Sequence, residues 1–100
     1  MIRVIYRWKV QNGKIPEFVE RLRKATKAIH QTTQGALGSF CLQDIKDEEE
    51  IITVAIWRTE EQWRRFMATA KNGSMSSMHE VATQLSATPY RQLGDETMSV

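Results

Sequence analysis

The chain has 100 residues, of which 41% are hydrophobic and 26% charged, and its formal net charge is only +2. This length predicts a single domain spanning residues 1–100, and so small and dispersed a charge argues against a nucleic-acid partner. No apolar run reaches the length of a membrane span and no secretory leader is recognised, so we expect no membrane partner. The one cysteine, Cys41, cannot form an intramolecular disulfide, which fits a cytoplasmic location.

The first third of the chain predicts a strand followed by a helix. Apolar and polar residues alternate over Met1–Val10, which is typical of a strand with one face on a core. An Asn-Gly turn ends this strand at Gly13. Apolar residues then recur at helical spacing from Ile15 to near Thr33, with Pro16 in the first turn, where a proline is tolerated.

The middle of the chain predicts an antiparallel hairpin. We expect a second strand over Ser39–Lys46, a polar turn at Asp47–Glu50 and a third strand over Ile51–Trp57. The third strand is apolar almost throughout, and Ser39–Ile45 also carries apolar residues at odd and even positions. Such strands indicate burial on both faces of the sheet.

A second helix is expected directly after Trp57. Thr59 stands three residues before Gln62, the spacing of a helix-capping box. Apolar residues follow at helical spacing: Trp63, Phe66, Met67 and Ala70.

The last quarter predicts a further short helix and an edge strand. An Asn-Gly pair at 72–73 is interpreted as a helix C-cap and Ser74 as the cap of a third helix. This helix would carry Met75, Met78, Ala82 and Leu85 on one side, with His79 and Val81 alongside. A final strand is expected at residues 89–93, because a proline is tolerated at a sheet edge.

The element order β-α-β-β-α-(α)-β predicts an α+β, ferredoxin-like fold with a four-stranded antiparallel sheet. Helices on one side of the sheet would leave its other face uncovered. Since the hairpin is apolar on both faces, we expect two sheets to pack face to face in a homodimer.

Sequence patterns for common catalytic and metal sites are missing. There is no phosphate-binding loop, no His/Cys spacing for a metal and no nucleophile elbow, so we expect no metal. His30 closes the first helix, where a cation interacts well with the helix dipole. His79 shares its segment with two methionines and is the better candidate for a pocket, while Cys41 is interpreted as a small buried hydrophobe.

Aromatic residues gather at the junction between the third strand and the second helix. They fit a core, which every domain of this size needs, and they fit equally well an adaptable cavity for a flat ligand. We keep both interpretations. The pocket interpretation predicts a cavity between sheet and helices with the following lining: Tyr6, Trp57, Trp63, Phe66 and His79.

Three short motifs resemble the antibiotic biosynthesis monooxygenase domain. They are RWKVQNGK at Arg7–Lys14 (followed by Glu17-Phe18), GALGS at Gly35–Ser39 and IWRTEEQW at Ile56–Trp63. Their order and spacing match the family over roughly residues 2–70. The resemblance implies a dimeric α+β barrel.

The resemblance also implies an activity. Members of the family oxygenate electron-rich phenols, anthrones or quinols with molecular oxygen and without a metal or flavin, so no cofactor is expected. Trp57 matches the family's strand-end tryptophan, and His79 is the candidate base, because an imidazole can accept a phenolic proton. A weaker hydrogen-bonding residue, Thr53, stands where some members carry an asparagine. These two catalytic candidates are joined by six candidate substrate-binding residues: Tyr6, Thr53, Trp63, Phe66, Met67 and Met78.

Two other functions remain open. Many small dimeric α+β barrels bind a ligand without turnover, and this chain would then be a non-catalytic binding protein. A branch of the same superfamily degrades haem. Its three functional positions correspond here to Tyr6, Phe66 and His79, and two of the three do not match.

Overall fold

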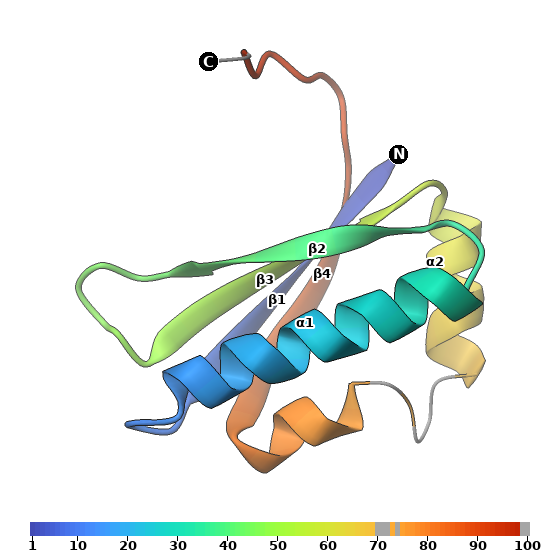
Figure 1. Cartoon of the computed structure of the whole chain (residues 1–100). Coiled ribbons are helices and arrows are strands. Elements are labelled where there is room, and N and C mark those ends of the chain that lie inside the picture. The colour runs from blue at the N-terminus through green and yellow to red at the C-terminus, as the bar shows by residue number, and fades with distance from the viewer. Residues whose placement is uncertain (70–72, 74, 99–100) are drawn as a thin grey trace.

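A computed structural model describes residues 1–69, 73 and 75–98 (Figure 1). The four strands form one antiparallel sheet with the order β2-β3-β1-β4. This confirms the α+β, ferredoxin-like arrangement. The elements, in chain order, are β1 (Ile2–Val10), α1 (Ile15–Thr32), β2 (Ala36–Gln43), β3 (Glu50–Trp57), α2 (Glu60–Thr69), the 3-10 helix η1 (Ser76–Glu80) and β4 (Ala82–Arg91).

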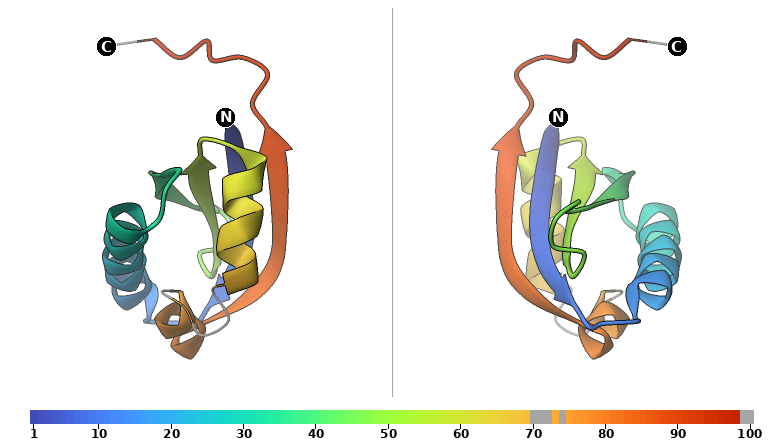
Figure 2. Two further views of the ribbon diagram at one scale, coloured as in Figure 1. Left: turned by 90° about the vertical axis from the view of Figure 1, so that its right-hand side faces the viewer. Right: turned by 90° about the vertical axis from the view of Figure 1, so that its left-hand side faces the viewer.

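The central strand β1 determines which face of the sheet carries the core. Its even-numbered residues are all buried, while Arg7 and Lys9 are exposed on the other face. Tyr6 lies opposite Thr53, and Trp8 lies opposite Ile51 on β3. Because residues directly opposite each other share a face, these side chains form one apolar surface. Both helices and η1 cover that surface, and the sheet curves around them (Figure 2).

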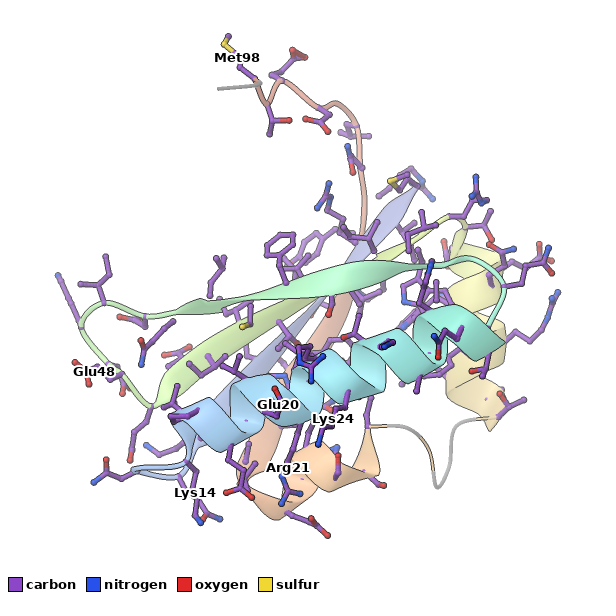
Figure 3. All side chains as sticks on the ribbon, viewed as in Figure 1. Lys14, Glu20, Arg21, Lys24, Glu48 and Met98 are labelled. Atoms are coloured by element: carbon purple, nitrogen blue, oxygen red, sulfur yellow. The ribbon has the colours of Figure 1, made fainter. Side chains whose placement is uncertain are left out.

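The α1 helix packs on the sheet through the apolar face that its sequence predicts. Phe18, Leu22 and Ala25 are its buried residues. On its outward side, Arg21 binds Glu17 and Glu80, and also donates to the carbonyl of Ser77 at 2.7 Å. In Figure 3 the Arg21 side chain points from α1 toward η1. This arginine therefore fastens η1 to α1.

The predicted third helix is wrong beyond Glu80. Only a short 3-10 helix, Ser76–Glu80, is present, and Ala82 and Leu85 belong to β4. The strand is long because it pairs with β1 along nearly its whole length, from Ile2 opposite Arg91 to Val10 opposite Ala82. As a strand, this segment gives hydrogen-bond partners to the backbone groups along one edge of β1. A helix at the same residues would leave those groups without partners. Three residues that the sequence analysis used, Ala70, Asn72 and Ser74, lie outside the described residues.

The second strand is displaced toward the N-terminus of its predicted range. It begins at Ala36 and ends at Gln43, so the prediction that it reaches Lys46 is wrong. The Asp44 carboxylate accepts hydrogen bonds from the amides of Lys46 at 2.7 Å and Asp47 at 3.0 Å. This side-chain cap turns the backbone early and leaves Ile45 fully in solvent.

The start of α2 shows one half of the predicted capping box, because the Gln62 side chain does not return to Thr59 and its Oε1 has no partner among the described residues. The amide of Gln62 donates to the Thr59 hydroxyl at 3.2 Å. In the part of the chain that the structure describes, neither α1 nor α2 is long and apolar enough to cross a membrane. The residues after β4 run away from the sheet as an extended tail that reaches Met98 (Figures 1 and 3).

Gly35 joins α1 to β2 in a conformation that other residues rarely adopt. Its φ is +91°, and the side chain of Gln62 packs directly on it, so an added Cβ would lie 2.1 Å from Gln62 Oε1. Its carbonyl also accepts a hydrogen bond from the Arg58 amide at 2.9 Å. Gly35 therefore fixes the distance between the α1–β2 connection and the start of α2.

Replacing Gly35 with alanine should destabilise the protein more than the same change at Gly13. Gly13 also has a positive φ, of +80°, but an added Cβ there meets nothing within 4 Å. Gly13→Ala should therefore cost only the backbone strain, about 1–2 kcal/mol in free energy of unfolding. Gly35→Ala should cost about 1–3 kcal/mol more, because Gln62 must move. Urea denaturation measures both values.

A double variant separates the two contributions. Gly35→Ala combined with Gln62→Ala should recover part of the extra loss, because the two closest atoms, Oε1 and Cδ of Gln62, are gone while its Cβ, 2.9 Å from the added Cβ, remains. Equal losses for Gly13→Ala and Gly35→Ala would contradict the close contact between Gly35 and Gln62.

Candidate functional site

A partly open cavity lies between the sheet and the layer formed by α1, α2 and η1. This inner cavity has a volume of about 40 Å³, and none of the described residues that line it is charged. A volume of this size holds a water molecule but no aromatic ring. Its lining consists of Tyr6, Leu22, Ala25, Thr26, Ile29, Ala36, Gly38, Ser39, Thr53, Ala55, Ile56, Trp57, Phe66, Met75 and Met78.

A second hollow, about equally open to solvent, adjoins the inner cavity. This outer depression has a volume of about 200 Å³ and shares Tyr6, Phe66 and Met75 with the inner cavity. The three shared side chains form the wall between the two spaces. The outer depression is completed by Met67, Gly73, Ser76, His79 and Gln84.

Tyr6 stands in that shared wall and is only 3% exposed. Its phenol oxygen accepts a long hydrogen bond, 3.4 Å, from the Trp63 indole N–H, and its O–H donates to the Met67 sulfur at 3.8 Å. Burial raises the pKa of the Tyr6 phenol above 10.0, while the hydrogen bond from Trp63 acts in the opposite direction. Tyr6 is therefore a neutral hydroxyl at physiological pH.

Thr53 contributes a second neutral hydroxyl, in the floor of the inner cavity. Its Oγ1 accepts a hydrogen bond from the buried Trp8 indole N–H at 3.0 Å. The Trp8 ring in turn packs edge-on against Phe18 and His79, with ring centroids 5.5 and 5.2 Å apart. Because Trp8 supplies the proton in that hydrogen bond, the Thr53 O–H is free to donate to another acceptor.

Trp57 ends β3 and is 3% exposed. Its ring lies against Phe66 of α2, with ring centroids 5.1 Å apart. Within the described part of the chain, no hydrogen bond joins its indole N–H to another residue, and this N–H is not among the fully buried unpaired atoms. The Trp57 N–H therefore has no hydrogen-bond partner among the described residues.

The structure distributes the residues predicted for the site over both spaces. Trp57 lines the inner cavity and His79 the outer depression, so the two predicted catalytic residues do not meet in one compartment. Trp63 lines neither space and instead lies behind Tyr6. Of the other predicted residues, Thr53 and Met78 line the inner cavity, Met67 lines the outer depression, and Tyr6 and Phe66 line both.

The α1 helix supplies part of the cavity that the sequence analysis did not assign. Leu22, Ala25 and Ile29 were expected on the packed face of this helix, but nothing in their spacing distinguishes a cavity wall from a filled core. Thr26 of α1 and Ser39 of β2 close one side of the cavity, and their hydroxyl oxygens are 2.6 Å apart. The Thr26 hydroxyl, in the middle of an otherwise amphipathic helix, was the one sequence feature that could have indicated a cavity here.

The remaining sequence candidates have structural roles. His30 Nδ1 lies 2.6 Å from the carbonyl oxygen of Ala36, which can only accept, so Nδ1 carries the proton and the ring ties the end of α1 to β2. Cys41 is half-buried on β2, and burial raises the pKa of its thiol. Among the described residues, no three His, Cys, Asp or Glu side chains are grouped closely enough to hold a metal ion.

Comparisons with known proteins identify a family model and several similar structures. The model for antibiotic biosynthesis monooxygenases matches residues 1–75. A mutant of SnoaB, a cofactor-independent oxygenase from Streptomyces nogalater, superimposes with a TM-score of 0.76 at 13% identity, over 97% of each chain.

Two further structures come from proteins assigned to the same family. The Bordetella bronchiseptica protein has a TM-score of 0.73 at 15% identity, over 92% of this chain and 96% of its own. The Nitrosomonas europaea protein has a TM-score of 0.71 at 17% identity, over 94% of this chain and 100% of its own. At these identities the similarity shows a common fold. The sequence has no significant match among curated proteins.

The protonation of Tyr6 can be measured directly. In a Tyr90→Phe variant Tyr6 is the remaining tyrosine, and its ultraviolet tyrosinate signal should appear only above pH 10.0. Adding Trp63→Phe removes the indole donor and should move that titration still higher. Because the unfolded chain releases this proton first, the free energy of unfolding should fall as the pH rises past 10.0. A titration below pH 10.0 would contradict the burial of the phenol.

Proposed function

Because this chain belongs to the antibiotic biosynthesis monooxygenase family, we propose that it is a cofactor-independent monooxygenase acting on an electron-rich aromatic substrate. The substrate would be a quinol, a phenol or an anthrone-like ring. The single observation that carries the proposal is the uncharged, largely apolar cavity beside the strand-end Trp57. The similarity in fold to SnoaB, itself a cofactor-independent oxygenase, supports it.

The proposed reaction needs no electron source besides the substrate. Loss of a proton gives a substrate anion, which passes one electron to molecular oxygen, and the resulting radical and superoxide combine at carbon. The hydroperoxide formed then loses water. For an anthrone-like substrate, a CH₂ group and O₂ become a C=O group and H₂O. The protein has to bind the ring, stabilise the anion and keep bulk water away.

The cavity offers neutral donors for such an anion. The Trp57 indole N–H has no partner within the described part of the chain, and the Thr53 hydroxyl can donate once Trp8 has donated to it. The Tyr6 O–H, held only by a sulfur contact to Met67, is a third donor. Preorganised dipoles of this kind stabilise a developing negative charge most effectively where water is excluded.

We assign the base to His79 in the outer depression. The imidazole is held edge-on to Trp8, with ring centroids 5.2 Å apart, and shares this space with Tyr6 and Phe66 of the inner cavity. A ring that extends from the inner cavity into the outer depression would bring its acidic group toward His79. The proton would then leave on the solvent side, while the anion stays near Trp57.

A bound ring needs more room than the inner cavity offers. Met75 and Met78 line it, and unbranched methionine side chains can change rotamer at small cost. Phe66 and Met75 also stand between the two spaces. Movement of these side chains would join the spaces into one site of the size that small-molecule ligands occupy, roughly 300 Å³ or more.

Trp57→Phe should lower the rate of oxygen consumption with a quinol or anthrone that the wild-type protein oxidises. Phenylalanine keeps most of the ring but has no N–H, so we expect a loss of about tenfold or more in kcat. His79→Ala should depress the rate chiefly at neutral pH, because at alkaline pH the substrate ionises without a base. An oxygen electrode and a panel of quinols and anthrones provide the measurement.

Trp63→Phe is the matched control. It makes the same chemical change at a buried tryptophan of α2 that lines neither space and reaches the site only through its long hydrogen bond to Tyr6. Its effect on kcat should therefore be smaller than that of Trp57→Phe. Wild-type activity in both Trp57→Phe and His79→Ala would remove these residues from the chemistry. If the protein binds the ring compounds but oxidises none of them, it is a non-catalytic binding protein. If it instead binds haem stoichiometrically in a titration, the haem-degrading function is favoured.

We also propose that the protein is a homodimer formed through the open face of its sheet. On β2, Phe40 and Leu42 lie opposite Val54 and Ile52, so they point away from the helices, and they are 42% and 55% exposed. Ile5 of β1, paired with Val54, extends the same apolar surface. A second copy would cover this surface and bury roughly 800 Å² on each partner.

Leu42→Asp should shift the protein toward monomers in light scattering at micromolar concentration, because the interface would then bury an unpaired charge. Val19→Asp introduces the same charge on the exposed side of α1, where Val19 is 42% exposed, and should leave the dimer intact. A monomeric wild-type protein would contradict the proposal.

A further inference from the structure

A groove runs along the outside of the inner cavity, between α1 and the edge strand β2. This α1–β2 groove has a volume of about 420 Å³, which exceeds that of the inner cavity and of the outer depression. Its surface is mostly apolar. It is lined by Val19, Leu22, Arg23, Thr26, Lys27, His30 and residues 37–41.

The groove and the inner cavity share one wall. Leu22, Thr26, Gly38 and Ser39 line both spaces, and the short contact between the Thr26 and Ser39 hydroxyls closes the wall. The groove has no residue in common with the outer depression, where His79 lies. The groove is therefore separate from the outer depression, and the wall formed by these four residues divides it from the inner cavity.

Positive charge lies along the α1 side of the groove. Arg23 and Lys27 are one helical turn apart, and no acidic residue is among the described residues that line the groove. The Arg23 guanidinium binds Glu20, with a nitrogen–oxygen distance of 2.6 Å. Lys27 forms no ion pair within the described part of the chain, so its ammonium is the cation available to a ligand.

We propose that the α1–β2 groove is a second ligand site, which binds an amphipathic organic anion. The ligand is an apolar body, aromatic or aliphatic, that carries one carboxylate or sulfonate. The apolar part covers Val19, Leu22 and Leu37, and the anionic group meets Lys27 with Arg23 beside it. Among its described lining residues the inner cavity has no cation, so it offers nothing that would select this anion. Binding in the groove is therefore independent of the proposed oxygenase activity.

Two fluorescent probes test the charge requirement. 8-Anilinonaphthalene-1-sulfonate and N-phenyl-1-naphthylamine have the same rings and differ by the sulfonate. The wild-type protein should bind the sulfonate probe more tightly. Lys27→Gln should weaken that binding about three- to tenfold, as expected for a partly screened charge pair, and leave the neutral probe unchanged.

Lys24→Gln is the matched control. Lys24 lies on the same helix, its side chain is 72% exposed, it forms an ion pair with Glu20 at 3.9 Å, and it does not line the groove. This variant changes the net charge by the same amount as Lys27→Gln. Its affinity for the sulfonate probe should remain that of the wild type, because the ligand would not contact residue 24.

Cys41 reports where the probe binds. It is the one cysteine of the chain, it lines the groove, and it pairs with Thr53 on the helix-covered side of the sheet. Bound sulfonate probe should slow alkylation of Cys41 by N-ethylmaleimide, with a concentration dependence that matches the fluorescence titration. A probe bound to the open sheet face would leave the alkylation rate unchanged.

Several results would overturn the proposal. These are absence of probe binding, equal affinity for the two probes, an equal loss in Lys24→Gln and Lys27→Gln, and an unprotected Cys41. A change in oligomeric state of Lys27→Gln, seen by light scattering, would show instead that a second copy of the chain occupies the groove. None of these readouts requires an oxidisable substrate, so they are independent of the proposed activity.

Discussion

The buried indole of Trp8 is the constraint on which the rest of the structure depends. A fully buried N–H without a partner would cost about 1–3 kcal/mol, and Thr53 of the neighbouring strand supplies the acceptor. Because Trp8 lies on the central strand, its ring also contacts Phe18 of α1 and His79 of η1. One side chain thus joins β1, β3, α1 and η1. The same hydrogen bond orients the Thr53 hydroxyl in the floor of the inner cavity.

The distribution of charge separates the interior from the surface. The described lining of the inner cavity has hydroxyl, indole and thioether groups but no ionisable group except the phenol of Tyr6, whose pKa is raised by burial. A neutral ring can enter such a space with little loss of hydration, whereas a permanent ion would pay a large desolvation cost. An anion that forms only after the ring has entered avoids this desolvation cost, because N–H and O–H dipoles already surround it. Two cations of α1, Arg23 and Lys27, lie outside, along the groove, where water screens them.

The contact between α1 and η1 links stability to the site. Arg21 binds Glu17 and Glu80 and the carbonyl of Ser77, so it fastens the outer side of the 3-10 helix to α1, while buried Met78 and the Trp8–His79 contact hold the inner side. Its hydrogen bond and charge lower the pKa of Glu17, which therefore stays ionised in this network to lower pH. η1 carries Met78 into the inner cavity and His79 into the outer depression. The outer surface of α1 thus contributes to the position of both residues relative to Tyr6.

Local sequence determined most of the fold, because periodicity records which side of an element is buried. Alternation over β1, helical spacing over α1 and the capping box at Thr59 were all readable from neighbouring residues. The final edge strand was expected only at residues 89–93, and it begins earlier and ends at Arg91. The part from Ala82 on was assigned to a helix, because its mixed apolar and polar residues fit a helix about as well as a strand, and pairing with β1 decided between them. The family resemblance pointed to Trp57 and His79, but it could not show that they line different spaces. Only the tertiary structure decides which distant residues meet, since that depends on strand register and helix packing rather than on spacing along the chain.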